Sequence, residues 1–190
     1  MSRSHPNAHA ELPELWLVSD ARNDSVLEAS LAGLTGRAGF IYRHYHLDPD
    51  SRRDRFEALS RLARNCGHLV VLSGSPRQAK RWGADGVYGP PDAIAHGPAM
   101  LRLGTAHSPR EIGAAVRARA DAVLLAPVFP TRSHPGAGTL GTLRFLLMAR
   151  QAPVPVVALG GMDRLRADRM RWPRWAAIDG LSAGYPLPDA

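Results

Sequence analysis

The sequence contains a single cysteine, Cys66, among its 190 residues. One thiol cannot form an internal disulfide or supply a cysteine cluster for a metal. The chain also lacks any run of 18 apolar residues, which excludes a membrane-spanning helix. Its first residues, MSRSHPNAHAELPE, lack the apolar stretch of a signal peptide. These absences predict a cytoplasmic protein with no membrane partner, in which residues 1–13 form a disordered lead.

Lysine is almost absent, because Lys80 is the only one and every other basic residue except histidine is arginine. Schiff-base chemistry in barrel aldolases needs a lysine at a strand end, and Lys80 lies away from one, so this class is not expected. Aromatic residues make up only 6% of the chain, and the net charge is +7. The arginines are scattered over helical segments and no nucleic-acid motif is present. The charge is therefore expected to reflect a general preference for arginine rather than nucleic-acid binding, with a modest attraction for phosphorylated small molecules.

Short apolar runs alternate with amphipathic segments along the chain. The runs span residues 15–19, 40–47, 69–72, 86–88, 100–105, 122–128, 154–159 and 176–181. Such alternation predicts a parallel sheet, and eight strands predict a single closed (β/α)8 barrel, a TIM-type fold, over residues 14–190. Because the chain is slightly shorter than the usual ~200 residues of such barrels, we expect shortened helices after strands three, four and eight.

Capping residues and apolar spacing mark several of the expected helices. Asp24 is the expected N-cap of a helix over residues 25–34. Ser108 and Glu111 form the pattern of a capping box. In residues 139–150, apolar residues at helical spacing predict one apolar face of an amphipathic helix. They are Leu140, Leu143, Leu147 and Met148.

Residue types that bind phosphate follow the last two runs. Gly160 and Gly161 follow the seventh run, and Ser182 and Ala183 follow the eighth. Loops after strands seven and eight of such barrels often hold a phosphate through backbone N–H groups, and glycine lets the backbone approach closely. The sequence therefore predicts a phosphate site here, with two ordinary turns as the alternative.

Two motifs carry a resemblance to a known family. Residues 126–136, APVFPTRSHPG, followed by residues 154–162, VPVVALGGM, resemble the paired motifs of the thiamine phosphate synthase family, which includes thiazole tautomerases. The family shows G-P-V-F-x-T-x-x-K-x-G and P-V-V-A-I-G-G-I at this separation. Three shorter segments also match the family pattern in the same order along the chain: LWLVSD, GADGV and HSPREI. The resemblance implies a barrel enzyme that joins an aminopyrimidine diphosphate to a thiazole phosphate, with Mg²⁺ and basic residues assisting release of diphosphate.

By this resemblance, Arg43, Thr105 and His134 correspond to positions that hold the diphosphate. Arg43 is the arginine that remains of the family's Q-x-R-E-K, and we expect it inside the second strand, where a charge is costly unless it is paired. Thr105 keeps the hydroxyl of a serine. His134 replaces a lysine, and a pKa near ~6.5 gives it only part of a positive charge at neutral pH. Each residue has a structural alternative. Arg43 could face solvent or pair with a structural carboxylate, Thr105 could cap a helix or turn, and His134 could be a solvated loop histidine.

The same resemblance places Thr131 near the thiazole, with a turn cap as its alternative. It also assigns Gly160, Gly161, Ser182 and Ala183 to the thiazole phosphate.

The metal site departs from the family pattern. Ser73 and Gly74 stand where the family carries Asn-Asp after strand three, so the first carboxylate is missing. Asp92 is the remaining candidate ligand, after a gap of one residue, whereas Asp85 precedes strand four and is expected to be structural. Mg²⁺ sites usually use one or two carboxylates plus substrate oxygens. We therefore expect Mg²⁺, where it is used, to depend on Asp92, and we expect synthase turnover to be weak.

Three functions remain open after these observations. The first is a synthase-like transferase of thiamine biosynthesis. The second is an isomerase of the tautomerase type with His134 as acid or base, although Pro127 stands where tautomerases carry a catalytic histidine. The third is a non-catalytic protein that binds phosphorylated ligands. The sequence makes no prediction of the oligomeric state.

Overall fold

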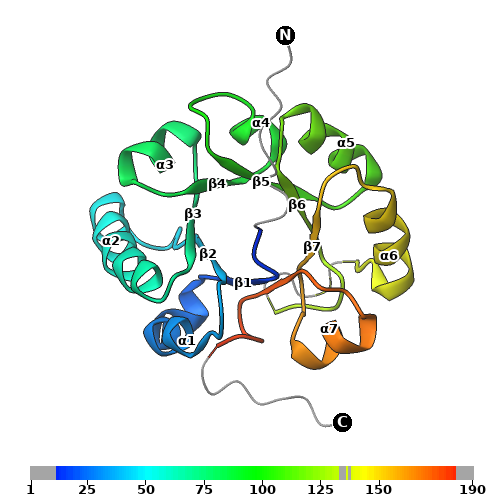
Figure 1. The fold of residues 1–190 in the computed structure, drawn as a ribbon, viewed down its shortest axis with the longest axis horizontal. Helices are drawn as coiled ribbons and strands as arrows, with labels where there is room; N and C mark the ends of the chain where they lie inside the picture. The colour runs from blue at the N-terminus through cyan, green and yellow to red at the C-terminus, as the bar shows by residue number, and fades with distance from the viewer. Residues whose placement is uncertain (1–11, 133–135, 137, 183–190) are drawn as a thin grey trace.

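The computed structural model describes residues 12–132, 136 and 138–182. Most of the expected lead, together with His134 and Ala183, lies outside these residues. Eight parallel strands close into a barrel in chain order, and β8 pairs with β1 (Figure 1). The expected (β/α)8 fold is confirmed. The strands are β1 Leu15–Val18, β2 Gly39–Tyr42, β3 Leu69–Ser73, β4 Gly86–Gly89, β5 Leu101–Ala106, β6 Ala122–Leu125, β7 Val156–Ala158 and β8 Trp175–Ala177.

The helices form a ring outside the strands (Figure 1). They are the 3₁₀ helix η2 Ala21–Val26 and the α-helices α1 Leu27–Gly33, α2 Pro49–Asn65, α3 Pro76–Trp82, α4 Pro91–Ile94, α5 Pro109–Arg117, α6 Gly141–Gln151 and α7 Arg164–Met170. The reduced helices expected after β3 and β4 are present as α3 and the single turn α4. No helix follows β8 within the described residues, which end at Ser182. Among the described helices, none is both long and apolar enough to cross a membrane.

The strands are buried on both faces, as their continuous apolar runs predict. Successive side chains point to opposite faces of a strand, so Leu17 and Phe40 pack under the helices while Trp16 fills the barrel interior. The indole of Trp16 lies where a side chain on Gly39 would stand, and its Nε1 donates to the Pro13 carbonyl oxygen at 2.9 Å. The interior is therefore filled at one end, and a cavity is left at the other.

Strand β2 ends earlier than the apolar run predicts. The run suggested residues 40–47, but pairing stops at Tyr42 because the backbone of His44 turns into the left-handed region at φ 41°. The placement of Arg43 inside the strand is therefore wrong. Arg43 directly follows the end of β2, where its side chain reaches the open end of the barrel.

Two helix predictions are also wrong. Asp20, not Asp24, caps the first helical segment, because the chain enters a 3₁₀ helix at Ala21 before α1 begins.

In α6 the buried residues are Phe145 and Ala149, whereas Leu143 and Leu147 are 71% and 54% exposed. Residues 145–149 are all apolar, so spacing could not select the inner face. The inner face is set by Phe145, whose ring packs edge-on against Trp172 with 5.3 Å between the ring centres.

Candidate active site at the open end of the barrel

A cavity of about 740 Å³ lies among the C-terminal ends of β2 to β8. This volume is in the range of small-molecule sites. Among the residues that line it are Arg43, Thr105, Thr131, Gly160 and Gly161. Positions far apart in the sequence are therefore brought together at the strand ends, as a parallel barrel requires.

The cavity lining carries an excess of positive charge. Arg43, Arg132 and Arg166 all line it, whereas Asp179 is the one carboxylate among its described lining residues. Asp179 is itself paired, since its Oδ2 lies 3.1 Å from Arg22 Nη1 and 3.8 Å from Arg132 Nε. This balance favours an anionic ligand. Sequence reasoning missed both Arg132 and Arg166, although Arg132 stands inside the first family motif.

Arg43 is held by a carboxylate and also faces the cavity. Its Nη2 lies 3.8 Å from Asp20 Oδ2, and its guanidinium lies 5.6 Å from the centre of the Tyr45 ring. Burial works to raise the pKa of Asp20, but hydrogen bonds from Arg22 and the charges of Arg22 and Arg43 hold that pKa below its ordinary value. Asp20 thus stays ionised at neutral pH and fixes the direction of the Arg43 side chain.

The turn after β7 needs glycine for two reasons. Gly160 and Gly161 adopt φ values of 95° and 61°, which disfavour other residues. A Cβ on Gly160 would lie 2.7 Å from Pro127 Cα, and one on Gly161 would lie 2.5 Å from the Pro130 oxygen. In the part of the chain that the structure describes, the N–H groups of these glycines donate to no backbone carbonyl. Such N–H groups in successive positive-φ residues form a concavity suited to an anion.

Ser182 and Asp92 are not brought into the cavity. The Ser182 hydroxyl donates to the Ile178 oxygen at 2.7 Å and its N–H to the Asp179 oxygen at 2.8 Å, so both donors hold the turn after β8. Asp92 is exposed in the single turn of α4 and is absent from the cavity lining. His134 and Ala183 lie outside the described residues.

The end of β3 carries a hydroxyl and a carbonyl group in place of a carboxylate metal ligand. The Ser73 hydroxyl forms a short hydrogen bond with the Tyr45 hydroxyl, and the Ser73 carbonyl accepts from Arg52 Nη2 at 2.7 Å. Gly74 follows with no side chain. Among the described residues, the ends of β3 and β4 therefore present no carboxylate to the cavity, and they do not fit Mg²⁺.

His107 is a lining residue that sequence reasoning did not select. Its Nδ1 lies 2.7 Å from the Ala126 carbonyl oxygen, which can only accept, so Nδ1 carries a proton. Among the described residues, no hydrogen bond engages Nε2, so this atom can exchange a proton. Tyr88 also lines the cavity, and burial raises its pKa to about 12, so it remains a neutral phenol at physiological pH. The signal for His107 was its place in HSPREI, directly after the fifth strand.

Comparisons with known proteins show the family and support the fold. A family model described as thiamine monophosphate synthase matches residues 15–180. The thiamine-phosphate synthase of Thiobacillus denitrificans is 30% identical over 171 residues, which cover 86% of this chain and 80% of the relative. The thiamine-phosphate synthase of Halorhodospira halophila is 32% identical over 167 residues, covering 81% and 78%. Among solved structures, a thiamine phosphate pyrophosphorylase from Pyrococcus furiosus superposes with a TM-score of 0.74 at 20% identity, covering 90% of this chain and 89% of that one, which supports the fold.

Proposed function

This chain belongs to the thiamine monophosphate synthase family, and from that premise we propose that it is a transferase of thiamine biosynthesis which joins an aminopyrimidine diphosphate to a thiazole phosphate. The observation that carries the proposal is the single cavity in which Arg43, Thr105 and Thr131 meet the glycine turn after β7. The phosphorylated substrates of this reaction are anions, which suit the positively charged lining of the cavity. A cytoplasmic location stays a prediction.

The reaction breaks the bond between the pyrimidine methylene carbon and the diphosphate oxygen, and the thiazole nitrogen forms a new bond to that carbon. Negative charge grows on the departing diphosphate, so groups aimed at it lower the barrier. We assign this role to Arg43 and Arg132, which both line the cavity. Thr105 adds a hydroxyl from the end of β5. No covalent intermediate with the protein is needed.

The thiazole phosphate is assigned to the turn after β7. The N–H groups of Gly160 and Gly161 supply donors, and Thr131 lies on the adjoining loop. Arg166 supports this turn, because its Nη1 donates to the Gly161 carbonyl while its guanidinium lies 5.1 Å from the centre of the Phe129 ring. In this proposal both substrates share one cavity, with the thiazole phosphate at the turn after β7 and the diphosphate at Arg43 and Arg132.

Electrostatic stabilisation at the diphosphate is weaker here than the family pattern supplies. Gly74 offers no carboxylate for Mg²⁺, so no step is assigned to that ion. His134 stands in place of a lysine, and an unperturbed imidazole carries only part of a positive charge at neutral pH. Since loss of one such donor typically costs ~10²–10³ in rate, we propose slow turnover with substrate binding retained.

One observation favours a second candidate, an isomerase that converts thiazole phosphate tautomers. The Nε2 atom of His107 is available to exchange a proton, because Nδ1 is committed to Ala126. An isomerase needs an acid or base and no leaving group. Release of diphosphate separates the two candidates. A protein that does neither reaction yet retains phosphate affinity is a non-catalytic binder.

The experiment is an assay of diphosphate release with both substrates, paired with calorimetric titration of each substrate alone. We expect release that requires both substrates and is lowered ~10²–10³-fold by Arg43→Ala. Arg53→Ala is the matched control, because Arg53 lies exposed on α2 and pairs only with Glu57 at 3.0 Å among the described residues. Absence of release from the unaltered protein, with thiazole isomerisation present, would replace the transferase proposal with the isomerase.

A further inference from the structure

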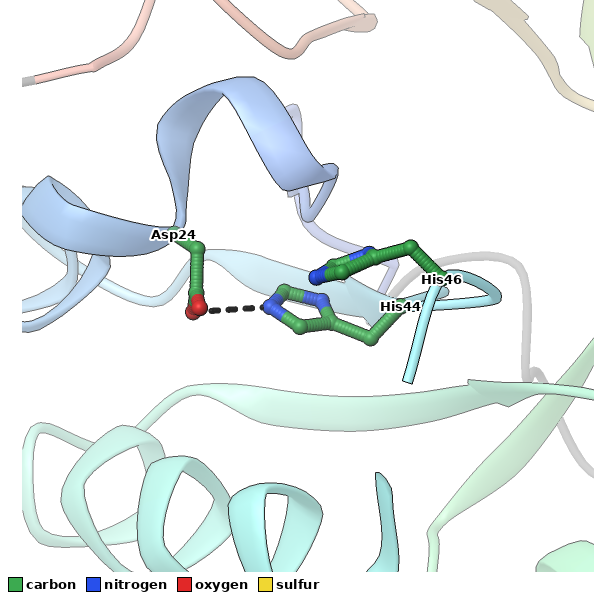
Figure 2. Close-up of side chains that lie close together, drawn as sticks. All are labelled: Asp24, His44 and His46. Atoms are coloured by element: carbon green, nitrogen blue, oxygen red, sulfur yellow. Dashed lines mark hydrogen bonds and ion pairs between the residues drawn. The ribbon is translucent and has the colours of Figure 1, made fainter. Parts of the chain in front are cut away.

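A cluster of possible metal ligands lies outside the cavity, between η2 and the segment that joins β2 to α2. Asp24, His44 and His46 each place a ligand atom within 4.8 Å of the others. Figure 2 shows the two imidazole rings lying one above the other, with the Asp24 carboxylate facing a ring nitrogen of His44. The distance from His44 Nε2 to Asp24 Oδ1 is 2.8 Å. Ligand atoms around a tetrahedral zinc lie about 3.4 Å apart, so only small shifts separate this arrangement from a coordinated one.

We propose that Asp24, His44 and His46 bind a divalent transition-metal ion of the zinc class. Two imidazole nitrogens and one carboxylate oxygen suit Zn²⁺ and its neighbours, whereas Mg²⁺ prefers oxygen ligands. Three protein ligands leave a fourth position for water.

His44 is oriented as metal-ligating histidines usually are. Its side chain is fully buried, and its Nδ1 lies 2.8 Å from Ser19 Oγ. The ring also stacks on Tyr42 with a centroid distance of 4.7 Å. A hydrogen bond to the second ring nitrogen fixes the tautomer and direction of a ligand histidine. The backbone of His44 has φ 41°, and such costly conformations concentrate at functional sites.

The His44 imidazole can stay neutral both with and without the metal, because its one proton moves between the two ring nitrogens. In the metal-free protein, His44 Nε2–H donates to Asp24, and Nδ1 accepts from the Ser19 hydroxyl. When a metal binds Nε2, the ring takes its other neutral tautomer, and Nδ1–H donates to Ser19 Oγ. That oxygen also accepts from the Arg43 N–H at 2.8 Å, and a hydroxyl oxygen has two lone pairs for these bonds.

The surrounding charge allows a cation despite a nearby arginine. Arg55 Nε donates to Asp24 Oδ1 at 2.9 Å, and the same guanidinium binds both carboxylate oxygens of Glu28. Two carboxylates thus face one guanidinium, which leaves one net negative charge on Asp24, Glu28 and Arg55 together. The Asp24–His44–Arg55 network is complete without His46, so it does not explain why that exposed imidazole lies 5.0 Å from the His44 ring.

Metal binding here has a consequence for the cavity. Arg43 and Tyr45 alternate with His44 and His46 along the chain, and both line the cavity. An ion held by the two histidines therefore fixes the segment that presents Arg43. The proposed site is separate from the diphosphate position, and it does not depend on which reaction the cavity performs.

The test uses untagged full-length protein, freed of metal with a chelator and titrated with Zn²⁺ in a calorimeter. The variant is His46→Gln, which removes an exposed ligand and leaves the buried network intact. The matched control is His96→Gln, an exposed histidine beyond α4. We expect one equivalent of Zn²⁺ in the unaltered protein and the control, and at least ~10-fold weaker binding in His46→Gln.

Two further measurements use the same proteins. Bound Co²⁺ should show the visible absorption of a tetrahedral site, and Zn²⁺ at the same concentration should raise the melting temperature of the unaltered protein more than that of His46→Gln. Equal Zn²⁺ affinity in His46→Gln and the unaltered protein would overturn the proposal, as would the absence of any stoichiometric binding.

Discussion

His107 and Ala126 are joined by a hydrogen bond of 2.7 Å from the imidazole Nδ1 to the backbone carbonyl oxygen. The bond links the residue that follows β5 to the one that follows β6. It fixes the tautomer of His107 and holds the imidazole against the cavity wall. The Nε2 atom can act as a proton carrier or as a simple hydrogen-bonding partner. The two roles differ in the loss of activity that removal of the imidazole would cause.

Replacing His107 with alanine distinguishes the two roles. We expect diphosphate release to fall by only ~10-fold, the value of one hydrogen bond, because the transferase reaction depends on charge stabilisation. The measurement is kcat for diphosphate release by variant and unaltered protein. A loss of ~10²–10⁴, the range for a general acid or base, would instead support proton transfer and the isomerase.

Arg43→Ala is expected to lower kcat for diphosphate release by ~10²–10³, because a guanidinium aimed at the leaving group stabilises the transition state. Arg43→Lys should recover part of the loss, since it keeps the charge without the fork of donors. Steady-state kinetics against the Arg53→Ala control measure the effect. Unchanged kcat in Arg43→Ala would remove this residue from the diphosphate site.

The strand ends show what sequence could and could not predict. The barrel was predictable because doubly buried parallel strands are continuous apolar runs. The end of β2 was not, because nothing in FIYRHYHL signals the positive φ of His44 that places Arg43 at the cavity. The same cavity is lined by Arg132, Arg166 and His107, which come from separate parts of the chain. Only the folded barrel brings them together, so local sequence spacing could not predict their association.

Ser182→Ala is expected to lower the free energy of unfolding by about 1 kcal/mol, because the hydroxyl donates to the Ile178 carbonyl. Affinity for inorganic phosphate should stay unchanged, since this hydroxyl is absent from the cavity lining. Urea denaturation and calorimetric titration of phosphate test the two parts. A clear loss of phosphate affinity with unaltered stability would return Ser182 to the phosphate site.

Asp20 should make stability depend on acid pH. Its pKa in the folded protein lies below the ordinary value of 3.8, so its contribution to stability is present above that pH and is lost as the pH falls through the lower, folded pKa. Asp20→Asn keeps a capping oxygen but has no charge. In urea denaturation, the unaltered protein should be more stable than the variant at pH 6, and the difference should shrink toward pH 3. A difference independent of pH would contradict this assignment.

The central claim is that this cavity performs the family's transfer reaction with weakened charge stabilisation. The most direct test is kcat for diphosphate release from the aminopyrimidine diphosphate and thiazole phosphate with Mg²⁺ present, measured beside a relative that keeps the strand-three carboxylate and the loop lysine. We predict release that requires both substrates and is at least ~10²-fold slower than in the relative, because Gly74 and His134 replace those groups. Turnover equal to that of the relative would contradict the account, and so would no release above the uncatalysed rate.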